Sequence, residues 1–129
     1  MDELEANRLL ANTYFESLME GDEAKMQSVF APGATFWTNF TEVDVLIADS
    51  IPRWCSLNTM FRNLHFEDVR RRGIPGGFLE QHTLCGIDED GQEMAVKGCF
   101  VGTIESGHIT RLEEYIDPSR RYRYQQEET

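Results

Sequence analysis

The second half of the chain contains four predicted strands joined by short turns, and this run restricts the fold more than any other feature. The strands are expected at His65–Arg72, Phe78–Ile87, Glu93–Ile104 and His108–Ile116. Each is rich in β-branched, aromatic or alternating residues. The turns between them contain Gly76, Gly91 and Gly107, which favour tight hairpins. Consecutive strands joined this way pair antiparallel, so the sequence predicts a sheet.

The first half of the chain reads mainly as helix. Helices are expected over residues 2–20, 23–30 and 43–63, the last one offset by Pro52, with a strand at 34–40. The order α-α-β-α-β-β-β-β predicts an α+β fold, a cone-shaped curved antiparallel sheet covered by the three helices. With 129 residues and no linker, 1–129 should be one domain, with a flexible polar tail over 119–129.

Charge and cysteine usage exclude several classes of function. The net charge of -11 disfavours nucleic acids and anionic membranes as partners. The one basic cluster, Arg70–Arg72, reads as a solvated strand end. Three cysteines without a C-x-x-C spacing indicate neither a disulfide framework nor a zinc site, and fit a reducing cytoplasm. No segment is long and apolar enough to span a membrane.

Two parts of the sequence carry a resemblance to a known superfamily. Residues 14–22 (YFESLMEGD) with 29–35 (VFAPGAT), and residues 107–117 (GHITRLEEYID), resemble the opening and closing elements of the nuclear transport factor 2-like superfamily. Within it the chain is most similar to the SnoaL-like branch of polyketide cyclases, limonene-epoxide hydrolases and ketosteroid isomerases. The resemblance covers about residues 7–119 and implies a cystatin-like α+β barrel around an apolar pocket.

Each of these activities can be compared with the residues present. Ketosteroid isomerisation is disfavoured, because Thr38 and Cys99 stand where that enzyme has its acids. The hydrolase resemblance places Asn39 and Glu114 in the water-holding half of the site. It also puts residues 81–83 (QHT) where the hydrolase has its Arg-x-Asp proton donor, so epoxide opening is disfavoured. A polyketide cyclase needs only one base and a shaped cavity.

Glu114 and His82 are the strongest candidates for acid–base chemistry. Strand alternation places Glu114 between Leu112 and Ile116 on one face, where desolvation would raise its pKa. His82 is a typical proton-transfer residue near neutral pH. The face that it occupies is ambiguous, since the resemblance turns Gln81 and Thr83 toward the cavity and His82 toward the outside.

The other candidates are expected to bind substrate. Trp37 and Asn39 share a face of the first strand, where Asn39 could orient a water or a carbonyl. Core packing is an equal alternative for these two residues and for Tyr14. The remaining expected pocket residues are Tyr14, Gln81, Thr83, Leu112 and Phe100.

The sequence therefore predicts an isomerase, cyclase, dehydratase or hydrolase that needs no cofactor or metal. Its substrate would be a small apolar oxygenated molecule, such as a polyketide, terpenoid or steroid-like compound. The alternative is a non-catalytic small-molecule-binding or dimerisation module of the same fold. In either case a homodimer packed through the outer sheet face is expected.

Overall fold

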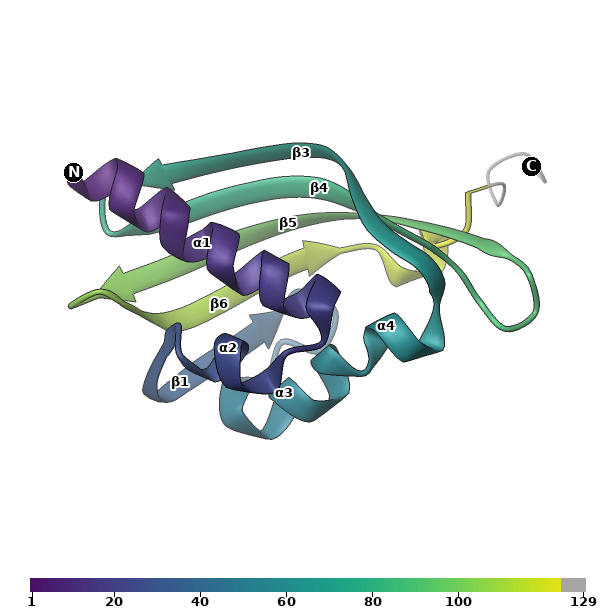
Figure 1. The fold of residues 1–129 in the computed structure, drawn as a ribbon, viewed down its shortest axis with the longest axis horizontal. Helices are drawn as coiled ribbons and strands as arrows, with labels where there is room; N and C mark the ends of the chain where they lie inside the picture. The colour runs from purple at the N-terminus through teal and green to yellow at the C-terminus, as the bar shows by residue number, and fades with distance from the viewer. Residues whose placement is uncertain (124–129) are drawn as a thin grey trace.

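The structure, a computed structural model that describes residues 1–123, is built on one curved six-stranded sheet (Figure 1). The strands are β1 (Phe30–Thr38), β2 (Val45–Leu46), β3 (Arg62–Ile74), β4 (Gly77–Ile87), β5 (Glu93–Glu105) and β6 (His108–Ile116). They lie in the order β2-β1-β6-β5-β4-β3. Strands β3 to β6 pair antiparallel, as the hairpin turns predict.

Strand β1 pairs parallel with β6, so the sheet is mixed and not wholly antiparallel. The sheet is also open, because β2 and β3 form its two edges. The predicted α+β class, a curved sheet with helices on one face, is confirmed. The parallel pairing carries the end of β1 alongside Glu113 and Glu114 of β6.

The helices all lie on one side of the sheet (Figure 1). They are α1 (Glu3–Glu20), α2 (Glu23–Gln27), α3 (Ile47–Cys55) and α4 (Leu57–Met60). The carboxylate of Asp2 caps α1 by accepting from the Glu5 N–H at 2.8 Å, and Gly21 ends the helix with φ 67°. The single helix expected over 43–63 is instead β2 followed by α3 and α4, with Pro52 inside α3.

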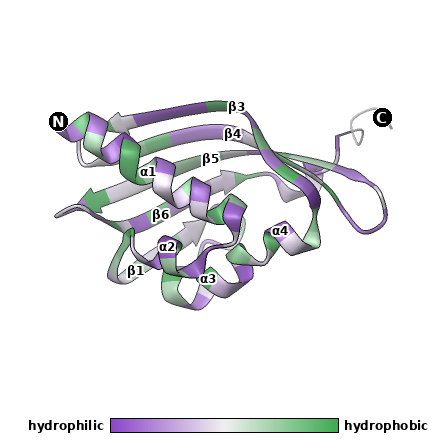
Figure 2. Ribbon diagram, in the orientation of Figure 1, coloured by the Kyte–Doolittle hydropathy of each residue, from purple (hydrophilic) through white to green (hydrophobic). Residues whose placement is uncertain are grey.

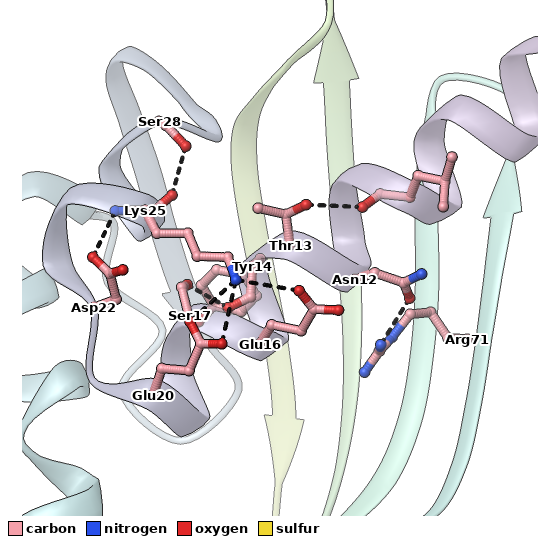
Figure 3. Close-up of polar contacts among 11 residues, drawn as sticks. Asn12, Thr13, Tyr14, Glu16, Ser17, Glu20, Asp22, Lys25, Ser28 and Arg71 are labelled. Atoms are coloured by element: carbon pink, nitrogen blue, oxygen red, sulfur yellow. Dashed lines mark hydrogen bonds and ion pairs between the residues drawn. The ribbon is translucent and has the colours of Figure 1, made fainter.

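A small polar cluster holds α2 against the end of α1 (Figure 3). The ammonium of Lys25 lies 3.3 Å from a Glu16 carboxylate oxygen and 3.1 Å from one of Glu20. The Ser17 hydroxyl donates to the Tyr14 carbonyl at 2.6 Å. Exposed ion pairs of this kind stabilise only slightly. Their effect is to fix the turn of α1 that presents Tyr14 to the sheet.

The core lies between α1 and the inner face of the sheet. Tyr14, Phe15 and Leu18 of α1 are buried. At the start of α1, Leu4 is 44% exposed, whereas Asn7 is buried and donates to the Ile74 carbonyl at 3.0 Å. Strand β3 is mainly hydrophilic along its length (Figure 2), as its position at the sheet edge allows.

The chain after β6 follows the sheet again within the described residues. A 3-10 helix, η1 (Pro118–Arg120), is followed by backbone hydrogen bonds from 121–123 to β5. The tail expected to be flexible from residue 119 is thus paired over 121–123, and its last part, 124–129, lies outside the described residues. None of the helices in residues 1–123 has the length and apolar character needed to cross a bilayer.

Candidate functional site

A pocket of about 90 Å³, partly open to solvent, lies between the helices and the inner face of the sheet. Most of its wall is apolar. The apolar lining includes Phe36, Trp54, Phe66, Phe100 and Ile116, and the polar lining is Tyr14, His82 and Glu114. A cavity that is mostly apolar with a few converging polar groups is typical of small-molecule sites.

Glu114 brings a carboxyl group into this cavity from β6. Within residues 1–123 no group hydrogen-bonds to that carboxyl, and burial raises its pKa from 4.5 to about 7. Desolvation acts this way because it disfavours the charged form. A carboxyl group with such a pKa is divided between acid and base near neutral pH, where general acid–base catalysis works best.

Tyr14 enters the same cavity from α1. Its ring is 2% exposed and packs edge-on against Phe30 and Trp54, with centroids 5.5 and 6.2 Å away. Burial, and then the nearby charge of Glu114, raise the pKa of the Tyr14 hydroxyl well above its usual value. The hydroxyl therefore stays protonated and can donate a hydrogen bond to a bound oxygen atom.

His82 reaches the cavity from β4 and is held from behind by Glu80. Its Nδ1 lies 2.8 Å from Oε2 of Glu80, whose side chain is fully buried. Arg71 binds the same carboxylate through two contacts, Nε to Oε1 at 2.7 Å and a terminal nitrogen to Oε2 at 3.0 Å. A carboxylate bound by a guanidinium can only accept hydrogen bonds, so Nδ1 donates to it. The Nε2 atom is then free to exchange a proton in the cavity.

Further contacts fix this buried cluster of Arg71, Glu80 and His82. The Asn12 side-chain oxygen accepts from Arg71 at 2.8 Å (Figure 3), and the guanidinium lies 4.5 Å from the centroid of the Phe15 ring. A second aromatic ring, that of Phe66, packs against His82 at 4.3 Å. Aromatic walls and charge-assisted hydrogen bonds leave the imidazole little freedom to turn.

Gly98 of β5 keeps open the space in front of His82. A side chain added there would place its Cβ 3.6 Å from Nε2 and 3.3 Å from Ile116. Such a Cβ would be tight only against Ile116, and Gly98 leaves that space in front of Nε2 unfilled.

Four of the residues predicted from the sequence come together in this cavity: Glu114, His82, Tyr14 and Phe100. Leu112, also expected in the pocket, is fully buried in the core beside it. The hydrolase resemblance implied that His82 faces outward, and this is wrong. The inner face of β4 carries Phe78, Glu80 and His82, all of them buried.

Gln81 and Thr83 consequently lie on the opposite, outer face of the sheet. They line a shallow outer groove with Lys97, Cys99 and Tyr115, away from Glu114. Their expected place in the pocket is therefore wrong, because successive side chains of a strand point to opposite faces.

Asn39 and Trp37 also lie away from the cavity. Both polar atoms of the Asn39 side chain are used on the backbone of Ile116: its nitrogen donates to the carbonyl at 3.1 Å and its oxygen accepts from the N–H at 2.8 Å. Asn39 thus ties β1 to β6 and does not line the cavity. The Trp37 ring packs against Tyr115 of the outer face at 5.4 Å.

Arg71 and Glu80 are the site residues that sequence reasoning missed. The expectation that Arg70–Arg72 is solvated is wrong for Arg71, whose side chain is only 16% exposed. The sequence does contain a signal for this ion pair. A two-residue turn at 75–76 pairs Ile74 with Gly77, and counting three residues back along β3 and three forward along β4 pairs Arg71 with Glu80. Opposite charges at directly paired positions favour one another.

Comparison with known proteins gives matches among solved structures only. No family model and no curated protein matches the sequence. A candidate polyketide cyclase from Xanthomonas campestris pv. campestris superposes with a TM-score of 0.76 at 16% identity, covering 92% of this chain and 95% of that one. An LEH-like epoxide hydrolase from M. tuberculosis gives 0.74 at 14% identity, covering 93% and 89%.

A third similar structure is described by the name of its fold. An NTF2-like protein from Burkholderia xenovorans LB400 superposes with a TM-score of 0.71 at 14% identity, covering 91% of this chain and 93% of that one. The chain has the nuclear transport factor 2-like fold.

The NTF2-like fold explains how the site residues are brought together. The curved sheet turns its inner face around α1, so β4 and β6, which are not neighbours, both direct side chains into one cavity. Within residues 1–123, the group of side chains that could bind a metal ion lies outside this cavity. It consists of His65, Glu67 and Cys85 on the outer face of the sheet.

Proposed function

We propose that this chain is a cofactor-independent acid–base enzyme that moves a proton on a small, apolar, oxygenated substrate. The observation that carries the proposal is Glu114, a carboxyl group with a pKa of about 7 in an apolar cavity. Strongly shifted pKa values in a cavity are characteristic of catalytic acids and bases. The structural neighbours described as a polyketide cyclase and an epoxide hydrolase support chemistry of this kind on this fold.

The residues in the cavity divide the chemical work between them. The Glu114 carboxylate removes a proton from a carbon atom next to a carbonyl group, and the electron pair moves onto the carbonyl oxygen. The Tyr14 hydroxyl donates a hydrogen bond to that oxygen and stabilises its developing charge. The proton now on Glu114 passes to Nε2 of His82, whose Nδ1 is held by Glu80, and Nε2 delivers it to another carbon or to a leaving hydroxyl group, so both side chains return to their starting state. The reaction classes open to this set are isomerisation, aldol cyclisation and dehydration.

A small cyclic ketone tests the first step directly. Cyclopentanone is compact, and exchange of its α-protons in D₂O is followed by ¹H NMR. We expect the wild-type protein to accelerate exchange, with the rate rising with pH through about 7 as Glu114 loses its proton. We expect Glu114→Gln to lower the catalysed rate by about 100-fold or more, the usual worth of a general base.

Glu113→Gln is the matched control, because its side chain belongs to the same strand but the opposite face. It should exchange protons at the wild-type rate. If Glu114→Gln is as active as the wild type, Glu114 is not the base. If the ketone raises the melting temperature without any exchange, the chain is a small-molecule-binding protein, the alternative function.

We also propose that the chain forms a homodimer through the outer sheet face. Two apolar side chains of that face, Val69 and Tyr115, are each 43% exposed and line the outer groove. Light scattering at micromolar concentration should give twice the chain mass of 14.9 kDa. Tyr115→Arg should shift the protein to a monomer, and a monomeric wild type would contradict the proposal.

A further inference from the structure

Three side chains with metal-binding atoms meet on the outer face of β3 and β4. His65 is paired directly across the strands with Cys85, and Glu67 lies two residues farther along β3 on the same face. The His65 ring nitrogens, the Glu67 carboxylate and the Cys85 sulfur offer ligand atoms that all lie within 4.8 Å of one another. Cys85 is buried, whereas the side chains of His65 and Glu67 are 41% exposed and can adjust by rotation.

The orientation of His65 is already that of a metal ligand. Its Nδ1 lies 2.7 Å from the carbonyl of Asn63, a residue held in the left-handed region at φ 54°. Nδ1 donates there, because a carbonyl can only accept. A backbone carbonyl on one ring nitrogen is the usual arrangement behind a histidine ligand, since it fixes the tautomer and directs Nε2 at the ion.

Two of these ligand atoms lie in close contact at the centre of the group. Nε2 of His65 lies 2.9 Å from a carboxylate oxygen of Glu67. Two lone pairs at that distance repel each other unless a proton or a metal ion lies between them. The Cys85 thiol donates to the Thr83 carbonyl at 3.9 Å, and its sulfur accepts from a guanidinium nitrogen of Arg123 at 3.5 Å.

We propose that His65, Glu67 and Cys85 bind a divalent transition-metal ion of the zinc type. The exchange balances in charge: one M²⁺ replaces the Nε2 proton of the imidazolium and the thiol proton, and both protons are released to solvent. Nitrogen, thiolate and carboxylate together are a donor set that zinc accepts. On a tetrahedral zinc ion these atoms would be separated by roughly 3–4 Å, which needs only small shifts from the present distances.

The surroundings leave a fourth position for water or a small ligand. A groove of about 500 Å³ runs beside Glu67 and Arg123 and is open to solvent. Arg123 now supplies the local positive charge, since its guanidinium also lies 3.5 Å from Glu67. A second carboxylate, that of Glu93, lies at the same distance from Arg123. The guanidinium can therefore stay paired with Glu93 when an ion takes its place beside Glu67.

Cobalt is the probe for the experiment, because Co²⁺ takes zinc sites and reports thiolate ligation through a charge-transfer band in the near ultraviolet. The reduced full-length protein is titrated with Co²⁺ and then with Zn²⁺ as the competitor. We expect the wild type to develop the band at one ion per chain and to lose it when Zn²⁺ is added. Cys85→Ser should abolish the band, and Glu67→Gln should weaken Zn²⁺ binding by at least about 10-fold.

Cys99→Ser is the matched control, since Cys99 is a second outer-face cysteine outside this cluster. It should bind Co²⁺ like the wild type. Arg123→Ala should bind Zn²⁺ more tightly, because a competing cation is removed. If Cys85→Ser does not fold, the exposed residue Glu67 still provides the test. Absence of the band in the wild type, its loss in Cys99→Ser, or an unchanged Zn²⁺ affinity in Glu67→Gln overturns the proposal.

Discussion

Replacing Arg71 with methionine is expected to lower the free energy of unfolding by about 3–5 kcal/mol, the usual cost of removing one partner from a buried ion pair. The carboxylate of Glu80 is fully buried and receives two hydrogen bonds from the Arg71 guanidinium. Without that partner the buried charge keeps only its contact with His82. Such a loss is a third or more of the stability of many domains. Urea denaturation of the two proteins at equal concentration measures it.

Arg72→Met is the matched control for this prediction. Arg72 is the next residue of β3, is exposed, and should change stability by no more than about 0.5 kcal/mol. The double variant Arg71→Met/Glu80→Met should recover much of the loss, because no unpaired buried charge is left. Equal effects of Arg71→Met and Arg72→Met would show that the buried ion pair does not stabilise the fold.

The second large effect is a dependence of stability on pH that comes from Glu114. Its pKa is about 7 in the folded chain against a usual value of 4.5. Below pH 4.5 both states are protonated at this residue and it contributes nothing. Between these two values the unfolded chain loses the proton while the folded chain keeps it, so the folded state loses stability as pH rises. Above pH 7 the cost is complete, at about 3 kcal/mol.

Glu114→Gln removes this cost, because a neutral amide replaces the titrating group. The variant should therefore be more stable than the wild type by about 3 kcal/mol at pH 8, and the difference should shrink toward pH 4. Urea unfolding curves at several pH values and one fixed protein concentration measure the difference. Glu113→Gln should show no comparable trend. A constant difference between Glu114→Gln and wild type at all pH values would contradict the raised pKa.

The hairpin half of the fold could be predicted from local sequence because its information is local. Glycine turns and alternation define β4, β5 and β6 to within a residue or so. The parallel pairing of β1 with β6 could not be predicted, because it joins residues more than seventy positions apart without any turn between them. Region 43–63 was difficult for a related reason: α3 and α4 are short, and tertiary packing decides where each begins and ends.

In the site, Glu114 was predictable because alternation on the last strand is regular. The sequence left the face of β4 ambiguous, because both of its alternating faces contain polar residues as well as apolar ones. Arg71 was missed because an irregularity in β3 separates it from the alternation of its neighbours. The strand shifts register between Glu67 and Arg70, where Asp68 has φ 54°. Such a β-bulge adds one residue to one strand of a pair.

That bulge exchanges the inward and outward positions of β3 for every residue that follows it. Before it, Phe66 faces the cavity and Glu67 faces out; after it, Arg71 faces in toward Glu80. One strand thereby serves both the buried cluster and the outer-face ligand group, which uniform alternation would not allow. If the same residues alternated regularly through Asp68, with no bulge, Arg71 would face solvent and Glu80 would lose its partner.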